Sequence, residues 1–151
     1  MQTIVALSHR AVIIRHWFEI DLDDASMEHG VRIELRELAA SPHRGSASAA
    51  QIVTADRPLW RADLFVRLAD APGSFGVAHF HPEFTGPEPC ARVWDPGLTA
   101  SPWQWLGDQI TVQAVTVSTP EDTPDQSELL ILIQYVLIET QSTQGLEILV
   151  Q

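Results

Sequence analysis

The sequence has no lysine, one cysteine and one tyrosine. Because the single thiol, Cys90, cannot form an internal disulfide, the cysteine content gives no sign of an oxidising compartment. All basic side chains are arginines, and none follows Arg92, although acidic residues continue beyond it. With a net charge of −11, the chain lacks the clustered basic surface that neutralises phosphates, which argues against nucleic acid as a partner.

The sequence also lacks an apolar run long enough to cross a bilayer. Its longest run, residues 129–138, is broken by Gln134 and has about half of the roughly 20 residues that a spanning helix needs. No charged N-terminal region precedes an apolar one, so the sequence predicts a cytoplasmic protein with no membrane partner. We expect the apolar run to be a buried element or the contact of a homodimer or other protein partner.

The chain has 151 residues, of which 45% are hydrophobic, and this is enough for one core. We therefore expect a single domain over residues 1–151. Residues 1–100 form its sheet and loop, and residues 101–151 its mainly helical C-terminal part.

Alternating apolar and polar side chains predict four strands, over residues 12–22, 31–36, 60–68 and 75–81. In the first of them, Glu19 and Asp21 would face arginines of the second strand across the solvent side. The predicted fold is α+β: a four-stranded antiparallel sheet in meander order, with one face covered by C-terminal helices.

Other segments have less regular patterns. Residues 41–50 are a loop or a short helix, and the prolines and glycines of residues 82–102 predict a loop. Ser101 and Pro102 are typical of a helix start. Residues 110–117 fit a helix or a strand equally well, and so do residues 126–141, where length favours a helix.

The best candidate for chemistry is the pair His79 and His81. On a strand, residues two apart point to the same side, so both imidazoles can bind one ion. Glu83 and His16 are the further ligands that we expect. Imidazole with carboxylate suits a divalent transition metal, and other oxygen and sulfur donors follow on the loop: Glu88, Cys90 and Asp95.

A structural role for the two histidines is the alternative. If the hairpin turn at residues 71–74 pairs Leu68 with Phe75, then His79 and His81 lie opposite Leu64 and Ala62. They would then be hydrogen-bonded histidines on the apolar face of the sheet.

The segment Gly73-Ser-Phe-Gly-Val-Ala-His79-Phe-His81 resembles the Gly-x5-His-x-His opening of the first cupin motif. The likeness covers these nine residues, and Gly86 stands near the place of the family's later Glu. The resemblance implies a metal site at the two histidines.

Two further resemblances concern longer parts of the chain. The order of strands and helix is loosely similar to that of toxin-type ribonucleases of bacterial toxin–antitoxin systems. This implies phosphate binding and proton transfer by four residues: Arg61, Arg67, His79 and His81. The segments RPLWRADLF (57–65), HFHPEF (79–84) and EPCARVWD (88–95) resemble the core of an uncharacterised bacterial domain family, which implies no activity.

Three functions are therefore open: a domain that binds a metal or small ligand, a small ribonuclease or other hydrolase, and a non-enzymatic interaction or dimerisation module. The sequence does not decide whether the protein is an enzyme.

Overall fold

A computed structural model describes residues 2–6, 10–20, 22, 26–40, 53–71, 73–116 and 133–141. Within them lies a sheet of five antiparallel strands in meander order: β1 (Gln2–Ala6), β2 (Arg10–Ile20), β3 (Met27–Ala40), β4 (Val53–Arg67) and β5 (His79–His81). The α+β class and the meander order are confirmed, and the predicted number of four strands was wrong by one. The additional strand, β1, has five residues and pairs through Ile4 with Ile13 of β2.

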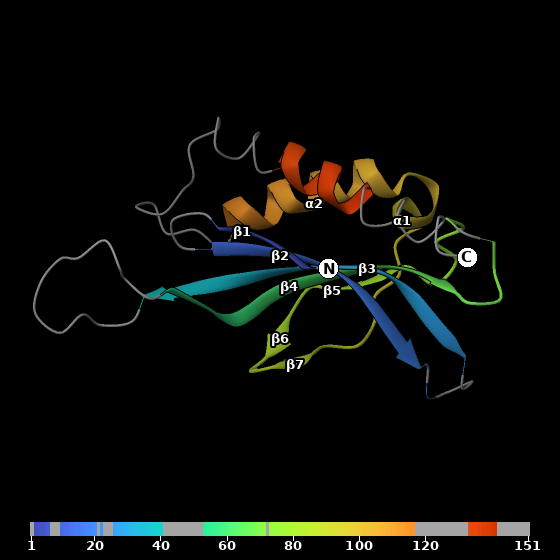
Figure 1. The fold of residues 1–151 in the computed structure, drawn as a ribbon, viewed down its shortest axis with the longest axis horizontal. Coiled ribbons are helices and arrows are strands. Elements are labelled where there is room, and N and C mark those ends of the chain that lie inside the picture. The colour runs from blue at the N-terminus through green and yellow to red at the C-terminus, as the bar shows by residue number, and fades with distance from the viewer. Residues whose placement is uncertain are drawn as a thin grey trace, which may run out of the picture.

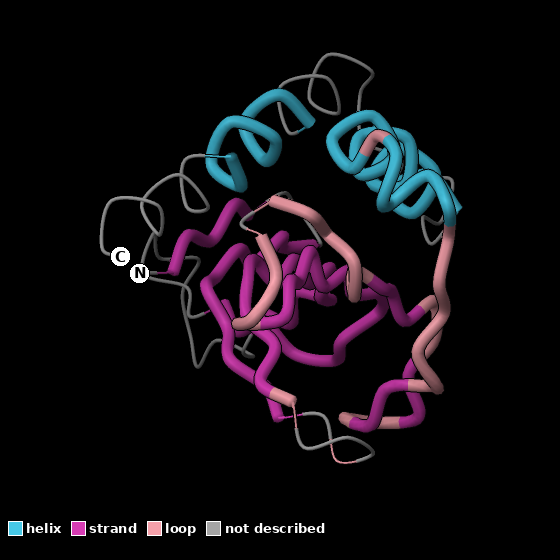
Figure 2. Tube along the Cα trace, turned by 90° about the vertical axis from the view of Figure 1, so that its right-hand side faces the viewer, coloured by secondary structure: helices cyan, strands magenta, loops and turns pink. Residues whose placement is uncertain are grey.

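Two helices follow the sheet, α1 (Pro96–Ala100) and α2 (Pro102–Thr116), and residues 133–141 are also helical. Figure 1 shows the helical segments together above the sheet, and Figure 2, turned by 90°, shows them side by side over its curled strands. A ribbon of β6 (Phe84–Thr85) and β7 (Glu88–Pro89) projects on the other side (Figure 1).

The helix start at Ser101 and Pro102 is confirmed, and α2 continues through residues 110–116. It is a helix there because Leu106 and Ile110, four residues apart, both pack into the core. Residues 133–141 agree with the helix that we favoured on length, and their Val136 is fully buried. The predictions for residues 41–50 and 126–132 lie outside the described residues. Among the described residues, no helix combines the length and the apolar character that crossing a membrane requires.

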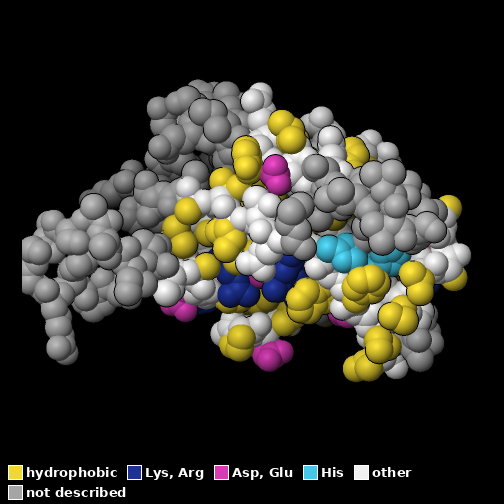
Figure 3. Space-filling model, in the orientation of Figure 1, with side chains coloured by type: hydrophobic (Ala, Val, Ile, Leu, Met, Phe, Trp, Pro, Cys, Tyr) yellow, Lys and Arg dark blue, Asp and Glu magenta, His cyan; other side chains and the backbone are white. Residues whose placement is uncertain are grey.

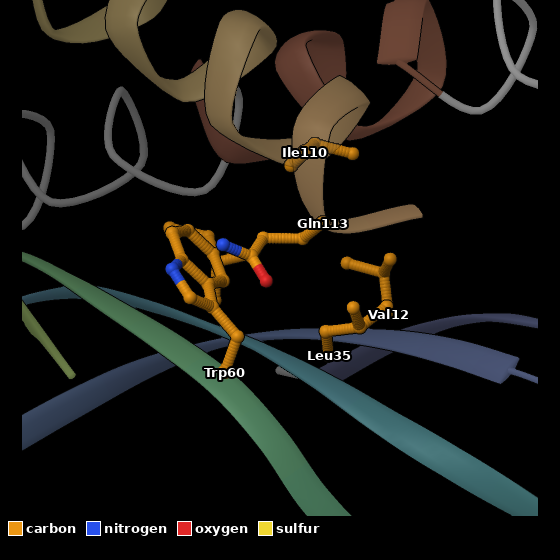
Figure 4. A pocket seen from close by; sticks show the side chains of 6 residues that line it. Val12, Leu35, Trp60, Ile110 and Gln113 are labelled. Atoms are coloured by element: carbon orange, nitrogen blue, oxygen red, sulfur yellow. The ribbon is translucent and has the colours of Figure 1, made fainter. Parts of the chain in front are cut away.

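The apolar core lies between the sheet and the helices. Its largest contacts are made by tryptophans: the rings of Trp60 on β4 and Trp105 on α2 stack with centroids 6.2 Å apart. Beside Trp60 a small cavity remains under Ile110 and Gln113 of α2 (Figure 4). Its other lining residues are aliphatic: Val12, Ile33 and Leu35. Close packing with little free space therefore fixes α2 on the sheet.

The hairpin of β2 and β3 extends past the helices and carries exposed apolar side chains. Phe18, Ile20 and Met27 are 57%, 58% and 44% exposed. The far end of this hairpin lies at the lower right of Figure 1, and Figure 3, in the same orientation, shows hydrophobic side chains gathered there. Toward the helices, the same face of the hairpin carries His16, whose ring centroid lies 4.8 Å from that of Phe18.

Gly30 on β3 permits the close approach of β4. It is buried, has a φ of 151°, and a Cβ at this position would lie 2.1 Å from the carbonyl oxygen of Leu64. That oxygen belongs to the backbone of β4 and can move only if the two strands separate. Gly76 gives a matched contrast, because a Cβ there would meet nothing closer than 3.7 Å.

We expect Gly30→Ala to lower the free energy of unfolding by more than about 3 kcal/mol, because it combines a backbone clash with a strained φ. Gly76→Ala should change it by less than about 1 kcal/mol. Urea denaturation of both variants measures this difference, and equal stabilities would contradict the close approach of β3 and β4.

Candidate metal centre

Charged side chains fill the face of the sheet that lies away from the helices. Strand register aligns them in rows: Arg32 lies opposite Asp63, which lies opposite His79. In the next row Glu34 lies opposite Arg61, which lies opposite His81. Directly opposite residues in antiparallel strands share a face, so the two histidines lie on the charged face.

The predicted register of this hairpin was therefore wrong by one residue. The expected pairing placed His79 opposite Leu64, whereas it lies opposite Asp63. A shift of one residue turns every side chain to the other face. The predicted strand at residues 75–81 is shortened to His79–His81, because the amide of Ala78 donates to the carbonyl of Phe75 in a turn. The interpretation of the histidines as residues of the apolar face is thereby corrected.

The ion pair between Arg32 and Asp63 is the centre of the charged face. Nε of Arg32 donates to Oδ1 of Asp63 at 2.6 Å, and Nη2 donates to Oδ2 at 3.1 Å. The same Nη2 donates to Glu19 at 2.6 Å, so Glu19 meets an arginine of β3 as expected, although Arg32 is buried and not on a solvent side. Asp21 lies outside the described residues. The guanidinium of Arg32 also lies 4.6 Å from the ring centroid of Trp17. Asp63 is 0% exposed and Arg32 is 4% exposed, so the pair is buried.

The segment after β7 covers one edge of this face. Val93 pairs with Phe80 of β5 in an isolated bridge. The neighbouring Arg92 reaches across to two acids, with its Nη2 3.2 Å from Glu19 and its Nη1 3.1 Å from Glu28. The ring of Trp94 lies with its centroid 6.1 Å from that of His79. A segment predicted only as a loop thus completes the surroundings of the histidines.

Backbone carbonyls fix both imidazole rings. Nδ1 of His79 lies 2.9 Å from the carbonyl oxygen of Val77, and Nδ1 of His81 lies 2.6 Å from that of Cys90. A carbonyl oxygen only accepts, so each Nδ1 carries a proton and donates it. In the neutral rings each Nε2 is then unprotonated, as a metal ligand must be.

The two Nε2 atoms meet at one carboxylate oxygen. Oδ2 of Asp63 lies 3.3 Å from Nε2 of His79 and 3.8 Å from Nε2 of His81. All three atoms lie within 4.8 Å of one another. Four ligands at the usual zinc bond lengths around a tetrahedron lie about 3.3 Å apart, so the spacing suits a small ion after slight adjustment. Asp63, His79 and His81 thus form a buried group that could bind a metal.

Nε2 of His79 has no hydrogen-bond partner among the described residues. This atom is buried and makes no hydrogen bond of acceptable geometry, although Oδ2 of Asp63 is near. The two atoms face each other at 3.3 Å. An unprotonated nitrogen facing a carboxylate oxygen is repelled by it, unless a proton or a metal ion lies between them.

The surroundings shift the pKa values of two members of the group. Burial alone would raise the pKa of Asp63, but the contact with His79, the hydrogen bonds from Arg32 and the charges of Arg32 and Arg61 lower it to about 2. Burial, followed by the charge of Arg61, lowers the pKa of His81 to about 4. At neutral pH the carboxylate is therefore ionised and His81 is neutral, the forms that bind metal.

The other predicted ligands lie elsewhere. Glu83 is exposed, and its backbone carbonyl accepts from Cys90. His16 lies opposite Val31 and so points to the face of the sheet that carries the apolar core. Glu88 is exposed in β7, and the carboxylate of Asp95 caps α1 by accepting from the amide of Gly97 at 2.7 Å. Neither Glu83 nor His16 belongs to the group around Asp63.

Of the two arginines implied by the ribonuclease resemblance, one lies beside the histidines. Nη2 of Arg61 is 2.8 Å from Nε2 of His81, whereas Arg67 lies opposite Glu28, six residues farther along β4. His79 and His81 are 0% and 4% exposed and Arg61 is 9% exposed. In this arrangement an RNA chain has no access to these groups.

Asp63 is the member of the group that sequence reasoning missed. Its signal was present, because an aspartate stands among the apolar residues of β4 on the same side as Arg61. A carboxylate at such a position is buried in the sheet and needs a partner.

We expect acid to destabilise the protein through His81. Its pKa is about 4 in the folded chain and 6.5 ordinarily. Between these values the unfolded chain binds the extra proton, so stability is full above about pH 6.5 and decreases as the pH falls to about 4. The loss should reach about 3 kcal/mol, and Asp63 adds a further loss between its ordinary value and about 2.

Urea denaturation from pH 7 to pH 4 measures this loss. His81→Gln should have a flatter pH profile than the wild type, and His16→Gln should keep the wild-type profile between those limits. The same slope in His81→Gln and the wild type would contradict a neutral buried His81.

No protein-family model, curated protein or solved structure matches this chain. No function therefore comes to it from a relative. The functional evidence is therefore the arrangement of Asp63, His79 and His81 on the charged face of the sheet.

Proposed function

We propose that the protein binds one divalent transition metal ion through Oδ2 of Asp63 and Nε2 of His79 and of His81. The observation that carries the proposal is the orientation of the two rings. Each is held by a hydrogen bond from Nδ1–H to a carbonyl oxygen, and each turns its Nε2 toward the same carboxylate oxygen. Outer hydrogen bonds of this kind orient the histidine ligands of metal sites.

The donor set indicates the kind of metal. Two imidazoles and one carboxylate suit zinc, iron, manganese, cobalt or nickel, whereas calcium and magnesium prefer oxygen ligands alone. Three protein ligands leave one position of a tetrahedral zinc ion for a small molecule such as water. Zinc is the first metal to test because the spacing of 3.3 Å between Oδ2 and Nε2 of His79 fits that geometry.

The burial of the group favours metal binding over hydrolysis. Asp63 and His79 are both 0% exposed, and neighbouring side chains cover His81. A bound ion would join β4 to β5 through its bonds to Asp63 and to the two histidines. Because it would bind only the folded chain, it should stabilise the fold.

We expect protein purified without a polyhistidine tag to take up about one zinc ion per chain after reconstitution. At a free zinc concentration 100 times the Kd, the free energy of unfolding should rise by about 2.7 kcal/mol. Metal analysis after dialysis measures the first quantity, and urea denaturation with and without zinc measures the second. Cobalt in place of zinc should give the intense visible absorption of a tetrahedral site.

Matched variants separate this site from other histidines. His79→Gln and His81→Gln should each lose the bound ion, while His16→Gln, outside the group, should keep it. Less than about a tenth of an ion per wild-type chain would overturn the proposal, and so would full zinc uptake by His79→Gln.

A further inference from the structure

The guanidinium of Arg61 occupies two of the three candidate ligand atoms. Its Nη2 donates to Nε2 of His81 at 2.8 Å, and its Nε lies 3.0 Å from Oδ2 of Asp63. An arginine only donates, so it uses the same lone pairs that a metal ion would use. Arg61 and an ion therefore cannot hold His81 and Asp63 at the same time.

A second acceptor for Arg61 lies directly beside it. Glu34 on β3 is the cross-strand partner of Arg61 on β4, and it is 4% exposed. Side chains paired in this way have Cβ atoms about 5 Å apart, which is well within the reach of an arginine. Two other arginines now share this carboxylate: Arg15 at 3.2 Å and Arg36 at 2.9 Å.

Arg15 and Arg36, the two arginines that contact Glu34, are partly exposed to water. The side chains of Arg15 and Arg36 are 27% and 26% exposed, so either can exchange its contact with Glu34 for water. Arg61, at 11%, cannot do so without moving along the sheet. Glu34 is thus a neighbouring buried carboxylate at which a displaced Arg61 keeps a charged hydrogen-bond partner.

We propose that Arg61 is a built-in competitor of the metal ion: it holds His81 and Asp63 in the metal-free protein and moves to Glu34 when the ion binds. This inference rests on the proposed metal site and describes its regulation. The exchange sets the metal affinity and changes the contacts of Arg15 and Arg36 at Glu34 when an ion binds.

Zinc titration of variants tests the exchange. Arg61→Met should bind zinc at least about ten times more tightly than the wild type, because the ion no longer displaces a charged hydrogen-bond donor. Glu34→Gln should bind it at least about three times more weakly, because the displaced guanidinium then meets a neutral amide oxygen instead of a carboxylate.

Each variant has a control that makes the same change of charge in the same network. Arg92→Met removes a cation that contacts none of the three ligands, and Glu28→Gln removes the carboxylate paired with Arg92. Both controls should stay within about a factor of three of the wild type.

The outcomes separate this inference from the metal site itself. If the wild type binds zinc and Arg61→Met binds it with the same Kd, the exchange is overturned and the metal site stands. If neither protein binds zinc, the metal site is overturned. Zinc binding by Arg61→Met alone would support the competition and overturn the proposed function of the native chain.

A measurement on the unchanged protein covers the case in which a variant does not fold. Crystal structures with and without zinc should show Nη2 of Arg61 leaving Nε2 of His81 and approaching the carboxylate of Glu34. A zinc-loaded structure in which Arg61 still contacts His81 would overturn the exchange.

Discussion

The ion pair between Arg32 and Asp63 is the contact on which the second face of the sheet depends. Both side chains are almost fully buried, and two hydrogen bonds join them. Removing one partner of such a pair leaves an uncompensated buried charge and costs about 3–5 kcal/mol. The pair also orients the carboxylate of Asp63, so that Oδ2 faces the histidines. The candidate metal centre is therefore a consequence of how the fold neutralises Asp63.

Much of the fold could be predicted from the sequence, because its signal is local. The alternation in β2, β3 and β4 separated their two faces correctly, but the charged face is largely buried and is not the solvent side that we expected. The pairing of β4 with β5 is not local. It depends on the path of residues 68–78, where Phe75 has a φ of 50° and a turn ends at Ala78. No period in the sequence encodes such a path, and the resulting error of one residue exchanged the two faces.

The candidate site was also predicted only in part, because some of its geometry depends on how the strands pair. His79 and His81 share a face because they are two apart on a strand, which needs no knowledge of the neighbouring strand. Finding Asp63 required the correct register with β4. His16 lies on the apolar face with Val12 and Ile14, as its spacing predicts, but only the register of β4 and β5 shows that His79 and His81 lie on the other face. Glu83 follows the histidines in the chain, but the ribbon of β6 and β7 begins directly after it.

Arg92 connects the last part of the sheet to the first hairpin. Its partner Glu28 is 64 positions earlier in the chain, and Glu19 is 73 positions earlier. Contacts between such distant residues form only after the intervening chain has closed into a loop, and they slow folding. The ion pairs of Arg92 with the hairpin of β2 and β3 can therefore close only after the chain up to Arg92 has folded back onto this hairpin. Full removal of water from the charged layer depends on that long loop closure.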